Sequence, residues 1–311
     1  MKRVVFPLLL SPVLAQADIL SDFSPFLGSS NPDYDAGDFS PDGVSDDPVR
    51  APFSPADSDF GVQEILGETS EAPKFHLFGS IDFNVTDNAP ATNRALEDSS
   101  FYTTLLVGGN WQSHLATGWF ADVGATMEFF EFERQNAMDF QNFSTHAGVV
   151  KTLVDLDDTV FFARYEYQWL VTGRWAETDY SVNRIRTGLQ KVLFARSNQE
   201  LGAGISAAFD IDANPDRLER NEYAAELSYT YWFREDLGAT LSWRGALWDF
   251  DTAGREDWNH TAGLSLHWRT CPHSTVYAHI FYSNNDSNTP LGVNDFESWN
   301  AGIGLGLNYS F

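Results

Sequence analysis

The feature that most constrains this chain is a series of twelve segments, between residues 74 and 311, in which apolar and polar residues alternate. A period of two places successive side chains on opposite faces of a β-strand. In FHLFGSIDFNV (75–85), for example, Leu77, Ile81 and Phe83 share one face. We therefore predict an all-β fold for this part of the chain.

The opposite face of these segments differs from the solvent face of a soluble sheet. It is rich in Gly, Ser, Thr and Asn and carries single charged residues, although glycine weakens a strand unless another group approaches it closely. If the apolar face contacts lipid and the polar face lines a lumen, a strand of about ten residues spans a membrane, and closure of the sheet pairs every backbone amide. We therefore predict a transmembrane antiparallel up-and-down β-barrel of about 12 strands.

The connections between the segments support this topology. Those after even-numbered segments are short, as in ARSNQE (195–200) and REDLG (234–238), whereas those after odd-numbered segments are longer, as in TDNAPATNRALEDSS (86–100). Outer-membrane barrels have short periplasmic turns and longer extracellular loops. An even number of strands therefore places the N- and C-termini on the periplasmic side.

Aromatic residues in the outward phase fall into two groups, as the two interfacial belts of a membrane barrel require. Those near the turns are Trp111, Trp119, Phe161, Phe233, Trp268, Tyr309 and Phe311, and those near the loops are Phe129, Trp169, Tyr223, Trp258, Tyr282 and Trp299.

The last strand carries a more specific signal. The sequence ends in LGLNYSF, in which Leu305, Leu307, Tyr309 and Phe311 alternate with small polar residues. This ending resembles the terminal strand of Gram-negative outer-membrane β-barrel proteins, a porin-like superfamily. The resemblance implies that the barrel-assembly machinery recognises these four residues.

The N-terminal part of the chain follows a different pattern. Residues 1–17 combine a basic start, an apolar run and a small-x-small ending, which indicates a secretory signal peptide. Residues 18–73 contain ten Asp and three Glu against Arg50, so their net charge is 1 − 13 = −12. We interpret this segment as a disordered, acidic periplasmic leader. A solvated tether is favoured over a lumen plug or a partner-binding arm.

Charged residues in the inward phase are the candidate site. The basic ones are Arg164, Arg184, Arg186, Arg244 and Arg269, and the acidic ones are Asp122, Glu128, Glu166 and Glu226. One interpretation makes the arginines a selectivity track for small anions or acidic sugars. The favoured alternative pairs them across neighbouring strands, for instance Arg186 with Glu166, as ion pairs that hold the wall. Inward aromatic residues would also crowd a conduit.

Two further kinds of site can be weighed. Asp210, Asp212, Asn214 and Asp216 have the alternate oxygen ligands of a calcium loop, but Pro215 replaces the usual glycine, so a Ca²⁺ site is the weaker interpretation. A membrane hydrolase would need a serine or a paired acid beside a histidine. The histidines are scattered, and we expect no catalytic residues and no other cofactor.

Taken as a sequence, the chain is expected to be a narrow porin-like channel in the outer membrane for passive passage of small solutes. A non-conducting structural or adhesion barrel is the alternative, and a membrane-embedded hydrolase is third. Its expected partners are outer-membrane lipid, the barrel-assembly machinery and small solutes. A net charge of −25 argues against binding to nucleic acid.

Overall fold

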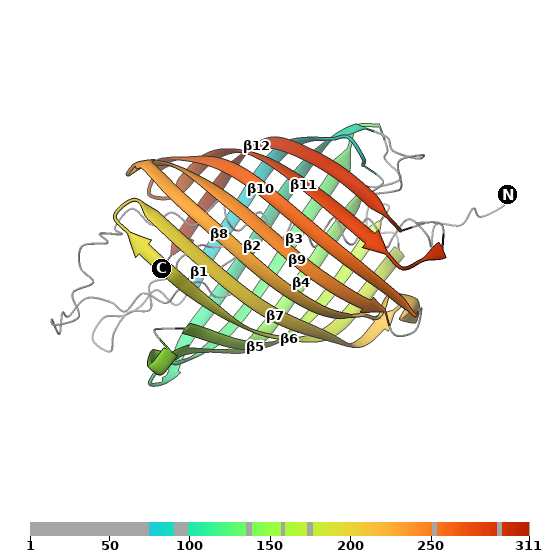
Figure 1. Ribbon diagram of the computed structural model, residues 1–311, viewed down its shortest axis with the longest axis horizontal. Helices are drawn as coiled ribbons and strands as arrows, with labels where there is room; N and C mark the ends of the chain where they lie inside the picture. Colours follow the sequence, from blue (N-terminus) through green and yellow to red (C-terminus); the bar gives the residue numbers. More distant parts are fainter. Residues whose placement is uncertain are drawn as a thin grey trace.

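The protein is a closed barrel of antiparallel β-strands that are inclined to the barrel axis (Figure 1). This computed structural model describes residues 75–89, 99–134, 139–156, 159–172, 177–250, 254–290 and 294–310. The barrel confirms the predicted all-β fold and its twelve strands. The predicted signal peptide (1–17), the leader (18–73), Lys74 and Phe311 lie outside the described residues.

Each strand pairs with its neighbours in the sequence. The strands are β1 (Phe75–Thr86), β2 (Ser100–Ala116), β3 (Trp119–Phe132), β4 (Phe140–Leu153), β5 (Thr159–Thr172), β6 (Glu177–Arg196), β7 (Gln199–Asn214), β8 (Asn221–Arg234), β9 (Leu237–Phe250), β10 (Arg255–Cys271), β11 (Ser274–Ser287) and β12 (Phe296–Ser310). Short 3₁₀ helices, η4 (Val154–Leu156) and η5 (Asp216–Leu218), lie between strands. Within the described ranges, no helix is long and apolar enough to cross a membrane.

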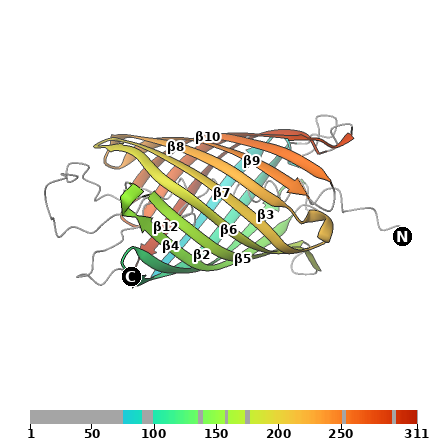
Figure 2. The ribbon, with the colours of Figure 1, turned by 60° about the horizontal axis from the view of Figure 1, so that its bottom comes forward.

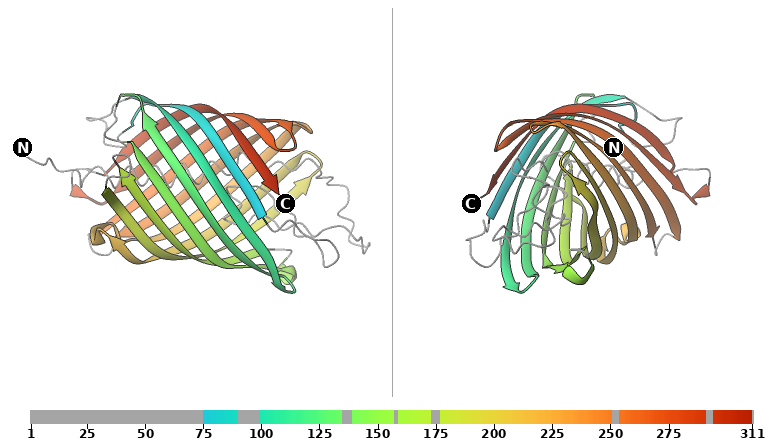
Figure 3. Two further views of the ribbon diagram at one scale, coloured as in Figure 1. Left: turned by 180° about the vertical axis from the view of Figure 1, so that it is seen from behind. Right: turned by 60° about the vertical axis from the view of Figure 1, so that its left-hand side comes forward.

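The barrel closes where the last strand meets the first. β1 pairs antiparallel with β12 from His76 opposite Ser310 to Thr86 opposite Asn300, and the two strands lie side by side in the left view of Figure 3. Ser310 and the start of β1 are therefore at the same end of the barrel. The connections after the even-numbered strands lie at this end too, because neighbouring strands are antiparallel.

The strands are longer than the predicted ten residues, and the connections are correspondingly shorter. They range from 12 residues in β1 to 20 in β6, and only Ser197 and Asn198 separate β6 from β7. The predicted alternation of short and long connections is not strict, since the connections at 173–176 and 251–254 are as short as a turn. Cross-strand pairing simply continues into residues that the sequence pattern assigned to loops. Figure 2 shows the long, inclined strands from a second side.

The two faces of the sheet have opposite character. Outward side chains are apolar and exposed, as shown by Leu241 (57 %) and Ile303 (60 %). Inward side chains such as Asn84, Asp122 and Asn259 are polar and buried. The inward aromatic residues Phe130, Phe162, Trp248 and Phe281 are also buried, as the sequence pattern predicts.

Glycines on the inward face of β12 allow side chains of its two neighbours to meet. Gly304 lies opposite both Asp82 of β1 and Tyr277 of β11, and the Tyr277 hydroxyl donates a hydrogen bond to Asp82 across it. A Cβ at position 304 would lie 2.2 Å from Asp82 Oδ1 and 2.5 Å from the Tyr277 ring. The small residue is therefore required at this position by close approach.

The next inward glycine repeats the arrangement. Gly302 lies opposite Asn84 and His279, whose Oδ1 and Nε2 atoms are 3.0 Å apart. At Gly306, by contrast, an added Cβ would meet its nearest atom at 3.6 Å, an ordinary contact. β1 and β11 are thus linked across β12 at two successive inward positions, and this link strengthens the seam where the barrel closes.

Gly304→Ala should destabilise the barrel because the added methyl group forces Asp82 and Tyr277 apart. We expect the free energy of unfolding to fall by about 1–3 kcal/mol, the usual cost of overpacking. The measurement is a urea titration of the protein in lipid vesicles, followed by tryptophan fluorescence. Gly306→Ala is the matched control and should change stability by less than about 0.5 kcal/mol. Equal effects of the two substitutions would contradict this account of the seam.

Candidate functional site on the inward face of the barrel

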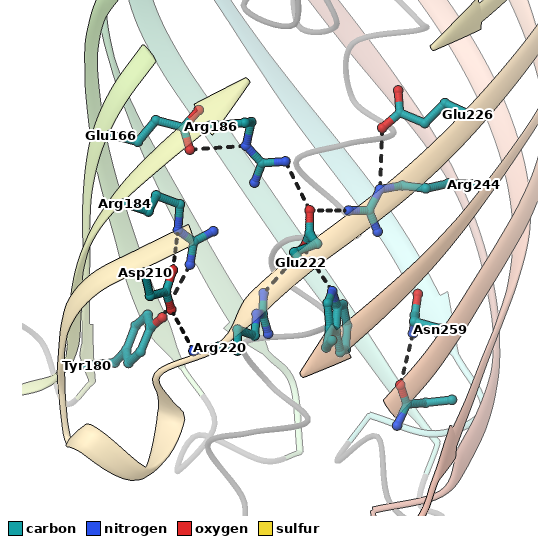
Figure 4. A network of polar contacts seen from close by, with 12 residues as sticks. Glu166, Tyr180, Arg184, Arg186, Asp210, Arg220, Glu222, Glu226, Arg244 and Asn259 are labelled. Carbon is teal, nitrogen blue, oxygen red and sulfur yellow. Dashed lines mark hydrogen bonds and ion pairs between the residues drawn. The ribbon is translucent and has the colours of Figure 1, made fainter. Parts of the chain in front are cut away.

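Glu222, at the start of β8, is the centre of a network of charged side chains (Figure 4). Its carboxylate accepts hydrogen bonds from Arg244 Nη2 at 2.9 Å, Arg186 Nη1 at 3.0 Å and Trp248 Nε1 at 2.8 Å. Arg220 Nη2 lies 3.8 Å away. These residues come from β6, β9 and the connection before β8, so the network ties β8 to three other parts of the wall.

The same arginines contact further carboxylates on the adjacent strands. Arg186 Nε is 3.2 Å from Glu166 of β5, and Arg244 Nε is 3.4 Å from Glu226 of β8. Glu226 and Arg244 are direct cross-strand partners. Each guanidinium is therefore shared between two acids, which hold it in position and balance its positive charge.

Two neighbouring ion pairs extend this charged wall toward β3. Arg184 Nε lies 3.1 Å from Asp210 Oδ1. Arg164 Nη2 lies 2.6 Å from Asp122 Oδ2, although their strands, β5 and β3, are separated by β4. The contact is possible because Gly148 of β4 lies opposite both residues, and a Cβ there would meet the Arg164 side chain at 2.7 Å.

The wall formed by β10, β11, β12 and β1 has a different chemistry. Near the loop end it carries neutral amides and hydroxyls that bond to one another, such as Thr261 with Ser283 at 3.2 Å and Thr86 with Ser298 at 3.1 Å. One ion pair, Arg255 Nε with Asp257 Oδ2 at 3.1 Å, also lies there. Asn300 Nδ2 also donates to Ser298 Oγ at 3.0 Å. The inward face therefore presents a charged side, on β3 to β9, and a largely neutral side.

The structure places most of the predicted site residues in ion pairs, either in the Glu222 network or in the two neighbouring pairs, but leaves some of them apart. Arg164, Arg184, Arg186, Arg244, Asp122, Glu166 and Glu226 take part in the ion pairs above. Arg269 lies over the Trp232 ring, 5.7 Å from its centroid, near the turns. Glu128 accepts a hydrogen bond from Asn142 Nδ2 at 3.0 Å.

Sequence reasoning missed the centre of the network. Glu222 is in phase with Glu226, four residues later on the same strand, so its inward position could have been read from the alternation. Arg220 precedes the strand, where no periodicity indicates the direction of its side chain. Only the structure shows that its guanidinium stacks on the Trp248 ring, 4.4 Å from the centroid.

The four residues with calcium-like spacing do not form a loop. Asp210, Asp212 and Asn214 belong to β7, and Asp216 begins η5. Asp210 pairs with Arg184 and accepts the backbone N–H of Arg220 at 3.1 Å. In the part of the chain that the structure describes, no three His, Cys, Asp or Glu side chains are grouped so as to hold a metal ion.

The histidines bear on the hydrolase alternative. His260 faces outward between the rings of Trp243 and Trp258, with centroids 6.2 and 6.4 Å away. His76 Nδ1 lies 2.8 Å from Ser310 Oγ, a contact that links the ends of β1 and β12. Among the described residues, no carboxylate lies within ion-pair distance of His76, so this pair lacks the third member of a triad.

Comparisons with known proteins show the fold. No protein-family model matches the chain, and a search of curated proteins finds no match. An outer-membrane channel from Pseudomonas putida F1 is similar in structure, with a TM-score of 0.52 and 11% sequence identity, over 79% of this chain and 98% of that one.

Two porins align with lower scores. The KdgM porin, solved in complex with disordered oligogalacturonate, has a TM-score of 0.40 and 11% identity over 75% of this chain and 99% of its own. An anion-selective porin from Comamonas acidovorans has a TM-score of 0.37 and 9% identity over 76% and 99%. Likeness at these levels supports no inference about solute or selectivity.

Glu222→Gln should destabilise the barrel strongly, because it removes the buried negative charge that Arg186, Arg220 and Arg244 share. Breaking a buried ion pair from one side costs about 3–5 kcal/mol, and we expect a loss of this size in a urea titration in lipid vesicles. Glu131→Gln, an exposed outward residue of β3, is the control and should change stability by about 0.5 kcal/mol at most. A loss below about 1 kcal/mol for Glu222→Gln would show that the network does not hold the wall.

Proposed function

We propose that this protein is a narrow channel of the outer membrane through which small hydrophilic solutes pass passively. The observation that carries the proposal is a closed barrel whose inward face carries many buried polar and charged side chains and whose outer face is apolar. A barrel with polar groups inside and apolar groups outside can enclose a hydrated lumen and contact lipid with its outer face. The fold shared with an outer-membrane channel supports the same function.

Inward side chains limit the width of the channel. A barrel of this strand number lies between filled eight-stranded barrels and wide porins. Phe130, Phe162, Trp248 and Phe281 further occupy the inward side. We infer that the solutes are small, since bulky inward rings leave less cross-section for a large solute.

The paired arginines have a structural role under this proposal. Arg164, Arg184, Arg186 and Arg244 each lie within ion-pair distance of a carboxylate, so their charges are largely cancelled within the wall. This arrangement supports the interpretation of the arginines as ion pairs that brace the barrel. It argues against a continuous track of positive charge for anions.

The membrane orientation and the export signals are part of the same proposal. We infer that the end carrying Ser310 and the even-numbered turns faces the periplasm, because short turns occupy that side of outer-membrane barrels. Residues 1–17 would act as the signal peptide, and residues 18–73 as a periplasmic leader. Leu305, Leu307 and Tyr309, with Phe311 after them, would be read by the barrel-assembly machinery.

Conductance in planar lipid bilayers tests the proposal. The full-length chain, purified from outer membranes in detergent, should produce discrete single-channel steps because a polar lumen crosses the bilayer. The same preparation, heated until the barrel unfolds, should produce none. If the folded protein also gives no steps, the channel function is wrong, and a structural or adhesion barrel becomes the better account.

A further inference from the structure

We propose that Asp82, together with the hydroxyl groups around it, forms a subsite for small cations on the inward face and gives the channel a preference for cations. This inference rests on the proposed channel function and specifies its solute class. It comes from one contrast in the wall: Asp82 is a buried carboxylate, and its described partners are neutral.

Three hydroxyl groups surround the Asp82 carboxylate. Ser80 Oγ and Thr104 Oγ1 each donate to Oδ2 at 3.1 Å, and the Tyr277 hydroxyl donates to Oδ1. The donors come from β1, β2 and β11, and Gly304 of β12 leaves the space for the last of them. The carboxylate is therefore held in a fixed position by hydrogen bonds from three strands.

None of these donors carries a positive charge. Asp82 is only 7 % exposed, and among the residues that the structure describes no arginine, lysine or histidine forms an ion pair with it. The nearest inward neighbours along β1, Ser80 and Asn84, are neutral as well. Hydroxyl donors satisfy the oxygen lone pairs but leave the charge of an ionised carboxylate uncompensated.

Several other inward acids differ in this respect. The inward carboxylates with an arginine at ion-pair distance are Asp122, Glu166, Asp210, Glu222, Glu226 and Asp257. The arginines that pair with them would hold back a mobile cation by repulsion. Among the described residues, no arginine lies at ion-pair distance from Asp82 to compete in this way.

A buried charge is stable when it is paired. In a solvated lumen the counterion of Asp82 can come from the solution, as a small cation that the carboxylate and the Tyr277, Thr104 and Ser80 oxygens attract. Oxygen ligands of this kind suit hard cations. Because arginines of the charged side are paired with acids, Asp82 adds a negative charge to the lumen that no described arginine compensates.

The test is the zero-current potential of single channels under a KCl gradient, with K⁺ as the probe. The wild-type protein should favour K⁺ over Cl⁻. In Asp82→Asn the ratio of K⁺ to Cl⁻ permeability should fall about fivefold, the factor that a unit charge supplies at about 4 Å in water. Asp82→Glu should keep the preference, and Glu131→Gln, which removes an acid from the outward face, should not change the ratio.

A second variant keeps the proposal testable if Asp82→Asn fails to assemble. Ser80→Lys places a fixed cation two residues along the same inward face, within reach of Asp82, and should abolish the preference with Asp82 still present. Steps that favour Cl⁻ in the wild type, or an unchanged ratio in Asp82→Asn or Ser80→Lys, would overturn the cation site while leaving the channel function intact. Absence of any steps would instead remove the channel function and this inference with it.

Discussion

The antiparallel pairing of β1 with β12 is the contact on which the rest of the structure depends. Hydrocarbon offers no water to an unpaired backbone amide, so a sheet can cross a membrane only when it has no free edge. Closure also decides which side of each strand is inside. Once the seam forms, the apolar phase faces outward and the polar phase is enclosed.

Inward glycines allow side chains of non-adjacent strands to contact one another across the closed sheet. Gly304 and Gly302 let residues of β11 and β1 meet across β12, and Gly148 lets Arg164 reach Asp122 across β4. In each case the middle strand has a glycine, so polar side chains from the two flanking strands can form a hydrogen bond or an ion pair across it. The polar lining is thus a set of bonds that span three strands, which adds cross-links to the backbone ladder.

The distribution of charge around the wall follows from the same bonds. Arginines on β5, β6 and β9 are paired with carboxylates, whereas β10 to β1 carry mainly amides and hydroxyls, one ion pair between Arg255 and Asp257, and Asp82, whose described partners are neutral. Counting arginines in the sequence suggests an attraction for anions. Pairing them in space cancels most of that attraction, so the sign of the field inside the barrel is a property of the arrangement.

The sequence by itself determined the barrel, its strand number and the side of each strand that faces lipid. The reason is that the two-residue alternation is a local property, which does not depend on which strands pair with each other. It also placed Arg186 near Glu166. Strand ends, the central position of Glu222 and the reason for Gly304 were decided by the tertiary structure alone. Those features depend on the register between strands that lie far apart in the chain, such as β1 and β11, and no local pattern encodes it.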